Sequence, residues 1–200
     1  MIDVERSEEA VEVGEPGKWN KAFLVQLQED FRGKCYLCEN YVGPHFQVDH
    51  RYPKAEHPER VVDRINLFPA CDFCNQHRWK KTRPGGFASP GENVEGRLEQ
   101  WIFYGDVRLR CAFRATDPND KPAVNAASEL ARLHLGGTPK SAALTAAIFS
   151  QALRIRRAEQ ALAANRQEKQ EHELRMLLSR NAPFTAVMRT EFHYLSAFFD

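Results

Sequence analysis

The sequence predicts an α+β fold that is mainly helical, with a small cysteine-stapled unit, a separate β-hairpin and a helical C-terminal region. Two Cys-x-x-Cys pairs, at 35–38 and 71–74, bracket short segments that are broken by Gly and Pro. Apolar residues recur at every second position over 107–113, which is the period of a β-strand. After residue 122 the chain is rich in Ala and carries helix start and stop signals.

Size and composition indicate an ordinary globular chain. Its 200 residues are 42% apolar and 28% charged, which is enough apolar material for one functional unit with a sizeable core. No charged segment followed by an apolar run opens the chain, and the longest nearly apolar run, residues 142–149, is too short to cross a bilayer. We therefore expect a cytoplasmic protein with no membrane contact, in which the five cysteines do not form a disulfide framework.

Charge is distributed unevenly along the chain. Residues 1–30 hold eight acidic against three basic side chains, whereas residues 31–83 hold ten Lys or Arg against six Asp or Glu. Basic charge around the cysteines suits contact with nucleic acid, although solvated surface charge is the alternative.

Residues 1–30 are predicted to form an acidic arm followed by a helix. The aromatic and aliphatic residues Trp19, Phe23, Leu27 and Phe31 recur every four positions, and Gly33 ends this helical stripe. We expect the helix to pack beneath the cysteine-rich unit.

Residues 31–85 are predicted to form that unit, as a hairpin and loop before a short helix, and residues 86–121 a linker and a second hairpin. The link over 84–98 is rich in Pro and Gly, and Gly105-Asp106 is a turn signal between the hairpin strands. Cys111 falls on the apolar side of the second strand, which indicates a small buried side chain rather than a nucleophile. The arginines of the other face meet either phosphate or water, and we favour water.

Residues 122–200 are predicted to be helical and to offer a surface for a partner. A helix near 124–135 is closed by Gly136-Gly137, and Thr138-Pro139 supplies the cap and first turn of a long helix. Its periodicity fades over 165–172, where it either breaks or continues as an exposed rod, and a last helix follows Pro183.

The cysteine pairs predict a zinc site. Cys35, Cys38, Cys71 and Cys74 supply four thiolates that can close tetrahedrally around Zn²⁺. Four Cys ligands leave no open position, so the zinc is expected to be structural and the chemistry to lie elsewhere. Chance pairing and redox chemistry are the alternatives.

The strings CYLCEN, VDHRYPK and INLFPACDFCNQHRWKK together resemble the HNH family of ββα-metal nucleases, in the subset with two zinc knuckles. The resemblance covers about fifty residues and implies a ββα-metal core. It implies that His50 is the general base, that Asp49 and Asn75 hold a catalytic Mg²⁺ or Mn²⁺, and that Asn66 braces the loop. These roles suit the chemistry, because phosphodiester hydrolysis needs a base for water and a cation for developing charge.

The same resemblance implies contacts to the substrate. Arg78 matches the basic residue that follows the family's last motif and is expected to hold the scissile phosphate. Flanking phosphates are expected to meet other basic residues: Arg51, Lys54, Lys80 and Lys81. Asp49 and His50 are neighbours in a predicted strand, so they can face one site only if a turn or bulge interrupts it. Asn75 stands where the family name has a second His, which leaves the preferred metal open.

Features within this core, and looser ones outside it, resemble the PtuB-type HNH nucleases of Septu and retron-associated antiphage systems. They include the DHxxPK string at 49–54 and the Ala-rich tail ending in Pro183-Phe184. This resemblance implies an effector that cuts nucleic acid, DNA favoured over RNA, beside an ABC-type ATPase. The alternative function is a non-catalytic zinc-knuckle module that binds nucleic acid or docks on a partner.

Overall fold

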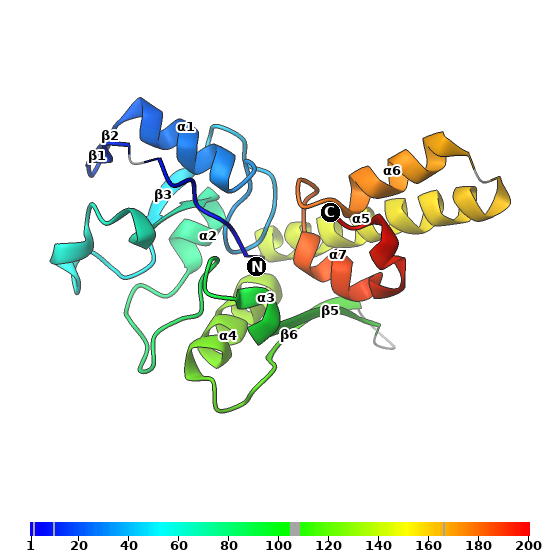
Figure 1. The fold of residues 1–200 in the computed structure, drawn as a ribbon. Helices are drawn as coiled ribbons and strands as arrows, with labels where there is room; N and C mark the ends of the chain where they lie inside the picture. Colours follow the sequence, from blue (N-terminus) through cyan, green and yellow to red (C-terminus); the bar gives the residue numbers. More distant parts are fainter. Residues whose placement is uncertain (2, 10, 105–108, 166) are drawn as a thin grey trace.

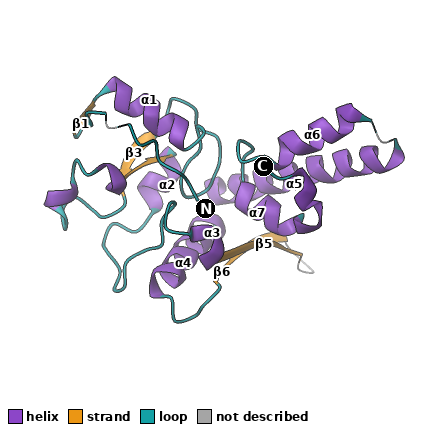
Figure 2. Cartoon of the chain, in the orientation of Figure 1, coloured by secondary structure: helices purple, strands orange, loops and turns teal. Residues whose placement is uncertain are grey.

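The computed structural model describes residues 1, 3–9, 11–104, 109–165 and 167–200. In this part of the chain, helices dominate and the strands form three separate two-stranded antiparallel sheets (Figures 1 and 2). The expected α+β, mainly helical fold is therefore confirmed.

The N-terminal region contains a short hairpin that the sequence did not predict. Strands β1 (Gly14–Glu15) and β2 (Lys18–Trp19) pair before helix α1 (Lys21–Asp30). The side chain of Asn20 caps α1 by accepting a hydrogen bond from the backbone N–H of Ala22 at 2.9 Å. The predicted helix is thus present, but Trp19 precedes it. At its other end, the Phe31 ring packs edge-on against Phe68 of the cysteine-rich unit, with centroids 5.7 Å apart.

The cysteine-rich unit has the order strand, strand, helix. Strands β3 (Gln47–His50) and β4 (Leu67–Ala70) are antiparallel, and helix α2 (Asp72–His77) follows directly. Two 3₁₀ turns, η1 (Pro58–Arg60) and η2 (Arg64–Asn66), shape the loop between the strands. The β3–β4 register is consecutive, with Asp49 opposite Phe68 and His50 opposite Leu67. Of the two expected interruptions, a turn or a bulge, the bulge is absent, and β3 instead ends at His50, where the chain bends.

The middle of the chain follows the prediction with one difference. A short helix, α3 (Val94–Arg97), lies in the Pro/Gly-rich link, for which no helix was predicted. Strands β5 (Leu98–Tyr104) and β6 (Leu109–Ala115) form the second hairpin, and Cys111 is buried on it. The predicted turn residues Gly105-Asp106, with Val107 and Arg108, lie outside the described residues.

The C-terminal region contains four α-helices among the described residues. These are α4 (Lys121–Leu135), α5 (Pro139–Ala164), α6 (Glu168–Leu178) and α7 (Thr185–Glu191), followed by a 3₁₀ segment, η3 (His193–Phe198). Thr138 caps α5 as predicted, since its side chain accepts from the N–H of Ser141. Helix α5 ends at Ala164, and α6 folds back along α5 to make a projecting helical pair (Figure 1).

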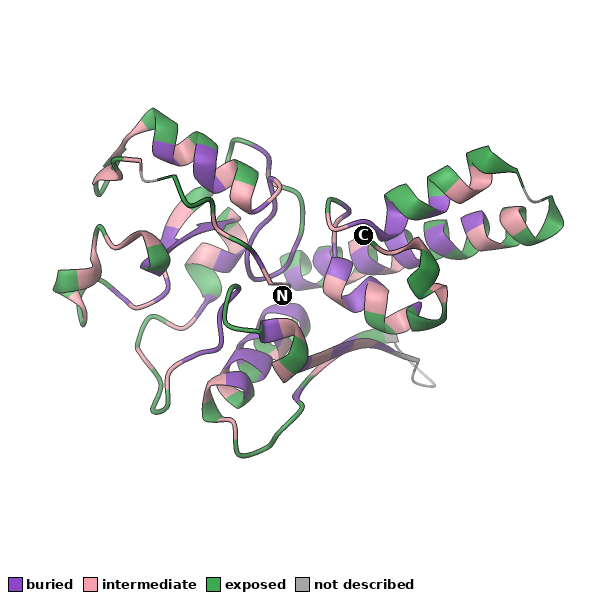
Figure 3. Cartoon of the chain, in the orientation of Figure 1, coloured by how far each residue is buried: buried purple, intermediate pink, exposed green. Residues whose placement is uncertain are grey.

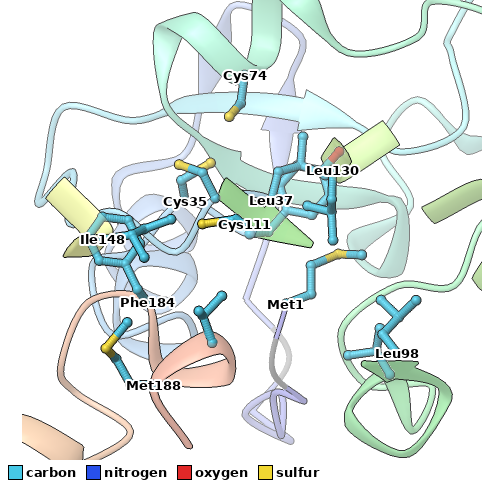
Figure 4. Close-up of a cluster of buried hydrophobic side chains, with 14 of the residues drawn as sticks. Met1, Cys35, Leu37, Cys74, Leu98, Cys111, Leu130, Ile148, Phe184 and Met188 are labelled. Carbon is cyan, nitrogen blue, oxygen red and sulfur yellow. The ribbon is translucent and has the colours of Figure 1, made fainter. Parts of the chain in front are cut away.

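One core joins the two halves of the chain. Buried residues line the inner faces of the helices (Figure 3), and Figure 4 shows Cys35, Cys111, Leu130, Ile148 and Met188 gathered from five elements or loops. Within the described residues, none of the helices has the length and apolar character needed to cross a membrane.

Two buried charged side chains beside the first cysteine pair fasten it to the connection between α6 and α7. The ammonium of Lys34 donates to the carbonyls of Arg180 at 2.6 Å and Ala182 at 3.1 Å, and to the Thr185 hydroxyl at 3.0 Å. Glu39 accepts from the backbone N–H of Ala186 at 2.9 Å and pairs at 2.7 Å with the amino group of Met1. The cysteine-rich unit and the C-terminal helices are therefore joined by buried polar contacts.

Candidate functional site

The four predicted zinc ligands converge. Cys35 and Cys38 lie in the loop after α1, and Cys71 and Cys74 lie at the start of α2. Their four Sγ atoms all lie within 4.8 Å of one another, and Cys38 and Cys71 are 3.9 Å apart. Thiolates at tetrahedral angles around zinc, at bond lengths of about 2.3 Å, stand about 3.8 Å apart. The cluster therefore fits a tetrahedral Zn²⁺ site.

The pKa values of Cys38 and Cys71 also indicate that the cluster needs a cation to be fully ionised. Hydrogen bonds from the Cys35, Cys38 and Cys74 thiols hold the pKa of Cys71 well below its usual range. Contact with Cys35 and Cys71, together with burial, raises the pKa of Cys38. Thiols so close together cannot all ionise unless a cation compensates them, which zinc does when bound. Cys71 also caps α2, because its Sγ accepts from the N–H of Cys74 at 3.3 Å.

The predicted catalytic residues line a second site on the same unit. A pocket of about 440 Å³ lies between the end of β3, the loop after it and α2. Its wall contains Trp19 and six sequence-predicted side chains: Asp49, His50, Lys54, Asn75, Arg78 and Lys80. Residues up to thirty-one positions apart are thus brought around one cavity.

His50 is held at the pocket edge through one ring nitrogen. Its Nε2 lies 2.9 Å from the carbonyl oxygen of Val61. A carbonyl oxygen can only accept, so Nε2 carries the proton and Nδ1 holds the lone pair of the neutral ring. The indole of Trp19 lies against the imidazole, with ring centroids 5.9 Å apart. This arrangement fixes both the tautomer and the orientation of the ring.

Asp49 is almost fully buried, and its contacts fall on one oxygen. Oδ2 accepts from the Tyr36 hydroxyl at 2.8 Å and lies 2.5 Å from Nε of Arg78. Burial, and then the charge of Asp49, raise the pKa of Tyr36 well above its usual value, so the phenol stays protonated as a donor. Within the described residues, Oδ1 receives no comparable contact and is the carboxylate oxygen left for a divalent ion.

Asn66 braces the loop that follows β3. Its Oδ1 accepts from the N–H of Tyr52 at 2.6 Å, and its Nδ2 donates to the carbonyls of Tyr52 at 3.1 Å and Arg60 at 3.0 Å. Its own carbonyl accepts from the N–H of Arg51 at 2.9 Å. Asn66 is fully buried, so it acts on the pocket through the backbone and not by contact with a substrate.

The chain is similar to Septu protein PtuB of Bacillus thuringiensis. The two sequences are 34% identical over 61 residues, which is 28% of this chain and 24% of that protein. The chain therefore matches about a quarter of the length of this relative. No family model matches the chain, and no solved structure matches it.

The predicted basic contacts divide into four groups. Lys54 and Lys80 are exposed at the pocket, Lys81 is exposed beyond it, and Arg78 is buried in its wall. The prediction that Arg51 contacts nucleic acid does not fit the structure, because this side chain is 1% exposed and pairs with Glu129 at 2.7 Å. Burial among the aromatic side chains explains the difference, since its guanidinium lies 4.2 Å from the centre of the Phe87 ring.

Sequence reasoning missed three residues that shape the site. Tyr36 and Trp19 flank Asp49 and His50, and Glu129 of α4 holds Arg51. Tyr36 sits inside the first Cys-x-x-Cys pair, which places it in the cysteine-rich unit, but no local pattern marks its contact with Asp49. Glu129 lies 78 residues from Arg51 and gave no local signal.

Proposed function

We propose that this chain is a metal-dependent endonuclease of the HNH type, which hydrolyses phosphodiester bonds in nucleic acid, with DNA favoured over RNA. The observation that supports it is the pocket in which an imidazole, a carboxylate and an amide meet three basic side chains, beside a four-thiol cluster. A module that only binds has no need of a base next to oxygen donors.

His50 supplies the base in this proposal. Because Nε2 donates to the Val61 carbonyl, Nδ1 accepts the proton of the attacking water. The same hydrogen bond stabilises the imidazolium that forms, since the donating N–H becomes more acidic and the carbonyl stays in place. An imidazole is suited to this role near neutral pH.

Asp49 and Asn75 are the proposed ligands of a catalytic Mg²⁺ or Mn²⁺. Their oxygens are the hard donors that such ions prefer, and both residues line the pocket. When bound, the ion would stabilise the charge that develops on the phosphate and the leaving oxygen. The Arg78 guanidinium meanwhile balances the buried carboxylate of Asp49.

Arg78 and Lys80 are the proposed contacts to the scissile phosphate. The terminal nitrogens of Arg78 donate to the carbonyl of Trp79 at 2.7 Å and of His50 at 2.5 Å, and each keeps a second N–H. Lys80 is exposed at the pocket mouth, where burial and then the nearby Arg78 lower its pKa. Lys54 and Lys81 are the proposed contacts to flanking phosphates.

The similarity to Septu protein PtuB supports a narrower proposal, in which the chain is the effector of an antiphage defence system. In this proposal it acts beside an ABC-type ATPase, and the helical region 122–200 offers the docking surface. Domain limits of 31–85 for the nuclease core and 86–121 for the linker and hairpin belong to the same proposal.

Plasmid nicking with Mg²⁺ or Mn²⁺ tests the enzyme. His50→Ala is expected to lower the rate by about 10²- to 10⁴-fold, because it removes the general base. His77→Ala is the matched control, since His77 is exposed on α2 outside the pocket wall, and its rate should stay within about twofold of wild type. Metal analysis should find equal zinc in all three proteins.

A silent wild-type protein should be assayed again with its copurifying ATPase. If both wild type and His50→Ala then bind nucleic acid equally and neither cuts it, the enzyme proposal is wrong. The alternative, a non-catalytic zinc-knuckle binding or adaptor module, would take its place.

A further inference from the structure

Glu129 is a buried acid that lies outside the candidate pocket. It sits in the middle of α4 and is fully buried. Its Oε2 accepts from Nη1 of Arg51 at 2.7 Å, and its Oε1 accepts from the backbone N–H of Trp79 at 2.9 Å. One carboxylate therefore uses both oxygens to hold two separate segments of the cysteine-rich unit.

Each of these two segments is one residue away from a proposed functional side chain. Arg51 directly follows His50 at the end of β3, and Trp79 directly follows Arg78 at the end of α2. The two segments also meet each other, because Nη2 of Arg78 donates to the carbonyl of His50 at 2.5 Å.

These contacts close a ring. It runs from Glu129 to Arg51, through the peptide bond to His50, across the hydrogen bond to Arg78, and through the next peptide bond to Trp79 and back. A closed ring of short contacts fixes the spacing between the end of β3 and the end of α2. That spacing sets where the imidazole stands relative to the guanidinium.

The ring is rigid because its charged members are out of water. The Arg51 and Glu129 side chains are each 1% exposed, and Arg51 also donates to the carbonyl of Ala88 at 3.3 Å. Buried charges attract strongly and leave few alternative positions for either partner. Since α4 also packs on β6 and α5, the ring connects the pocket to the helical region.

We propose that Glu129 is a positioning residue for the candidate nuclease site, which holds His50 and Arg78 at the distance that the reaction needs. This inference rests on the proposed function. It also means that a displacement of α4 changes the geometry of the pocket, although no residue of α4 belongs to the pocket wall.

The test compares Glu129→Gln with Asp120→Asn. The first change keeps an oxygen acceptor for Trp79 but removes the charge that holds Arg51. The second neutralises a carboxylate at the start of the same helix, where Asp120 pairs with Arg97 outside the ring. Glu129→Gln is expected to lower kcat at least about tenfold with KM within about twofold, because misplacement of about 1 Å costs up to about 10²-fold. Asp120→Asn should leave kcat unchanged.

A second variant and a second measurement distinguish a positioning role of Glu129 from a purely structural one. Arg51→Met with Glu129→Gln leaves neither ionised side chain buried, so thermal stability should recover while kcat stays low. Recovery of kcat together with stability overturns the proposal.

The NMR signals of the His50 imidazole give a readout that does not depend on cutting. They should shift in Glu129→Gln and not in Asp120→Asn. Unchanged His50 signals overturn the positioning role whatever the activity. Shifted signals in a protein that cuts no nucleic acid support the positioning role and remove only the nuclease.

Discussion

At the N-terminal end of α2, Cys71 and Cys74 meet two further thiols in a cluster set against the core, whereas Asn75 and Arg78 of the same segment line a pocket. The four Sγ atoms lie within 4.8 Å of one another, and four thiolates around one ion leave no open coordination position. The pocket has room, and its carboxylate is already balanced by a guanidinium. One six-residue helix thus serves a closed site suited to holding an ion for stability and an open site suited to chemistry.

Cys74→Ala is expected to disrupt the thiol cluster and to have the largest effect on stability of the substitutions considered. Structural zinc contributes on the order of 10 kcal/mol to folding in small zinc domains, which is comparable to the whole stability of a typical protein. We expect loss of bound zinc, measured by metal analysis, and loss of the near-ultraviolet circular dichroism of the core. Cys111→Ala is the matched control, because Cys111 is also buried but stands outside the cluster. Equal zinc in the two variants would contradict the assignment.

Arg78→Met is expected to have the next largest effect. It leaves Asp49 buried without its cation, and breaking a buried pair in this way costs about 3–5 kcal/mol. Urea denaturation measures the loss, and added Mn²⁺ should restore part of it, because a divalent ion replaces the missing charge.

Arg97→Met provides the comparison, since Arg97 pairs with Asp120 at a partly exposed position and should cost about 1 kcal/mol or less. If the two variants lose the same stability, the pocket carboxylate is not the buried charge described above.

His134→Phe tests a buried histidine close enough to the thiol cluster for the charge of Cys71 to affect its pKa. Burial first, and then the amino group of Met1, lower the pKa of His134 to about 3, whereas Glu39 and Cys71 act in the opposite direction. The unfolded chain takes up this proton below about pH 6.5 and the folded chain does not, so stability is present above that pH and falls on acidification.

Between pH 7 and 5.5, the wild type should therefore lose about 1 kcal/mol more than His134→Phe, measured from urea midpoints at each pH. The Phe side chain can keep the stacking on Phe113, whose ring lies 4.8 Å from the imidazole. An identical pH dependence in the two proteins would show that His134 does not resist protonation.

Lys81→Ala is expected to have the smallest effect and concerns the basic surface beyond the pocket. Losing one phosphate contact should lower the slope of log affinity against log salt concentration by about 1. Lys169→Ala is the control, because Lys169 is exposed on α6, away from the pocket residues. The same slope change in both variants would mean that nucleic-acid contact is not specific to the cysteine-rich unit.

Local patterns account for most of what the sequence predicted correctly. The Cys-x-x-Cys spacing predicted the thiol cluster, Thr138-Pro139 predicted the start of α5, and Gly136-Gly137 predicted the end of α4. In each case the signal and the structure lie within a few residues, so propensity and capping decide the outcome.

The errors have a different physical origin. Arg51 was predicted at the surface because nothing near it announces a buried acid, and its partner stands on a helix 78 residues away. Of the expected turn or bulge, the bulge is absent because β3 stops at His50, so the imidazole stands at the end of the strand. β1 and β2 have two residues each, which is too short for an alternating pattern to show.

Lys34 and Glu39 flank the first cysteine pair and both hold the segment between α6 and α7. The backbone N–H of Phe184 donates to the carbonyl of Glu39, and that of Ala186 donates to its carboxylate. These two amides can exchange with deuterated solvent only when their hydrogen bonds to Glu39 open. Deuterium uptake at these two amides therefore reports how often the loop that carries Cys35 and Cys38, almost 150 residues earlier, moves away from α7.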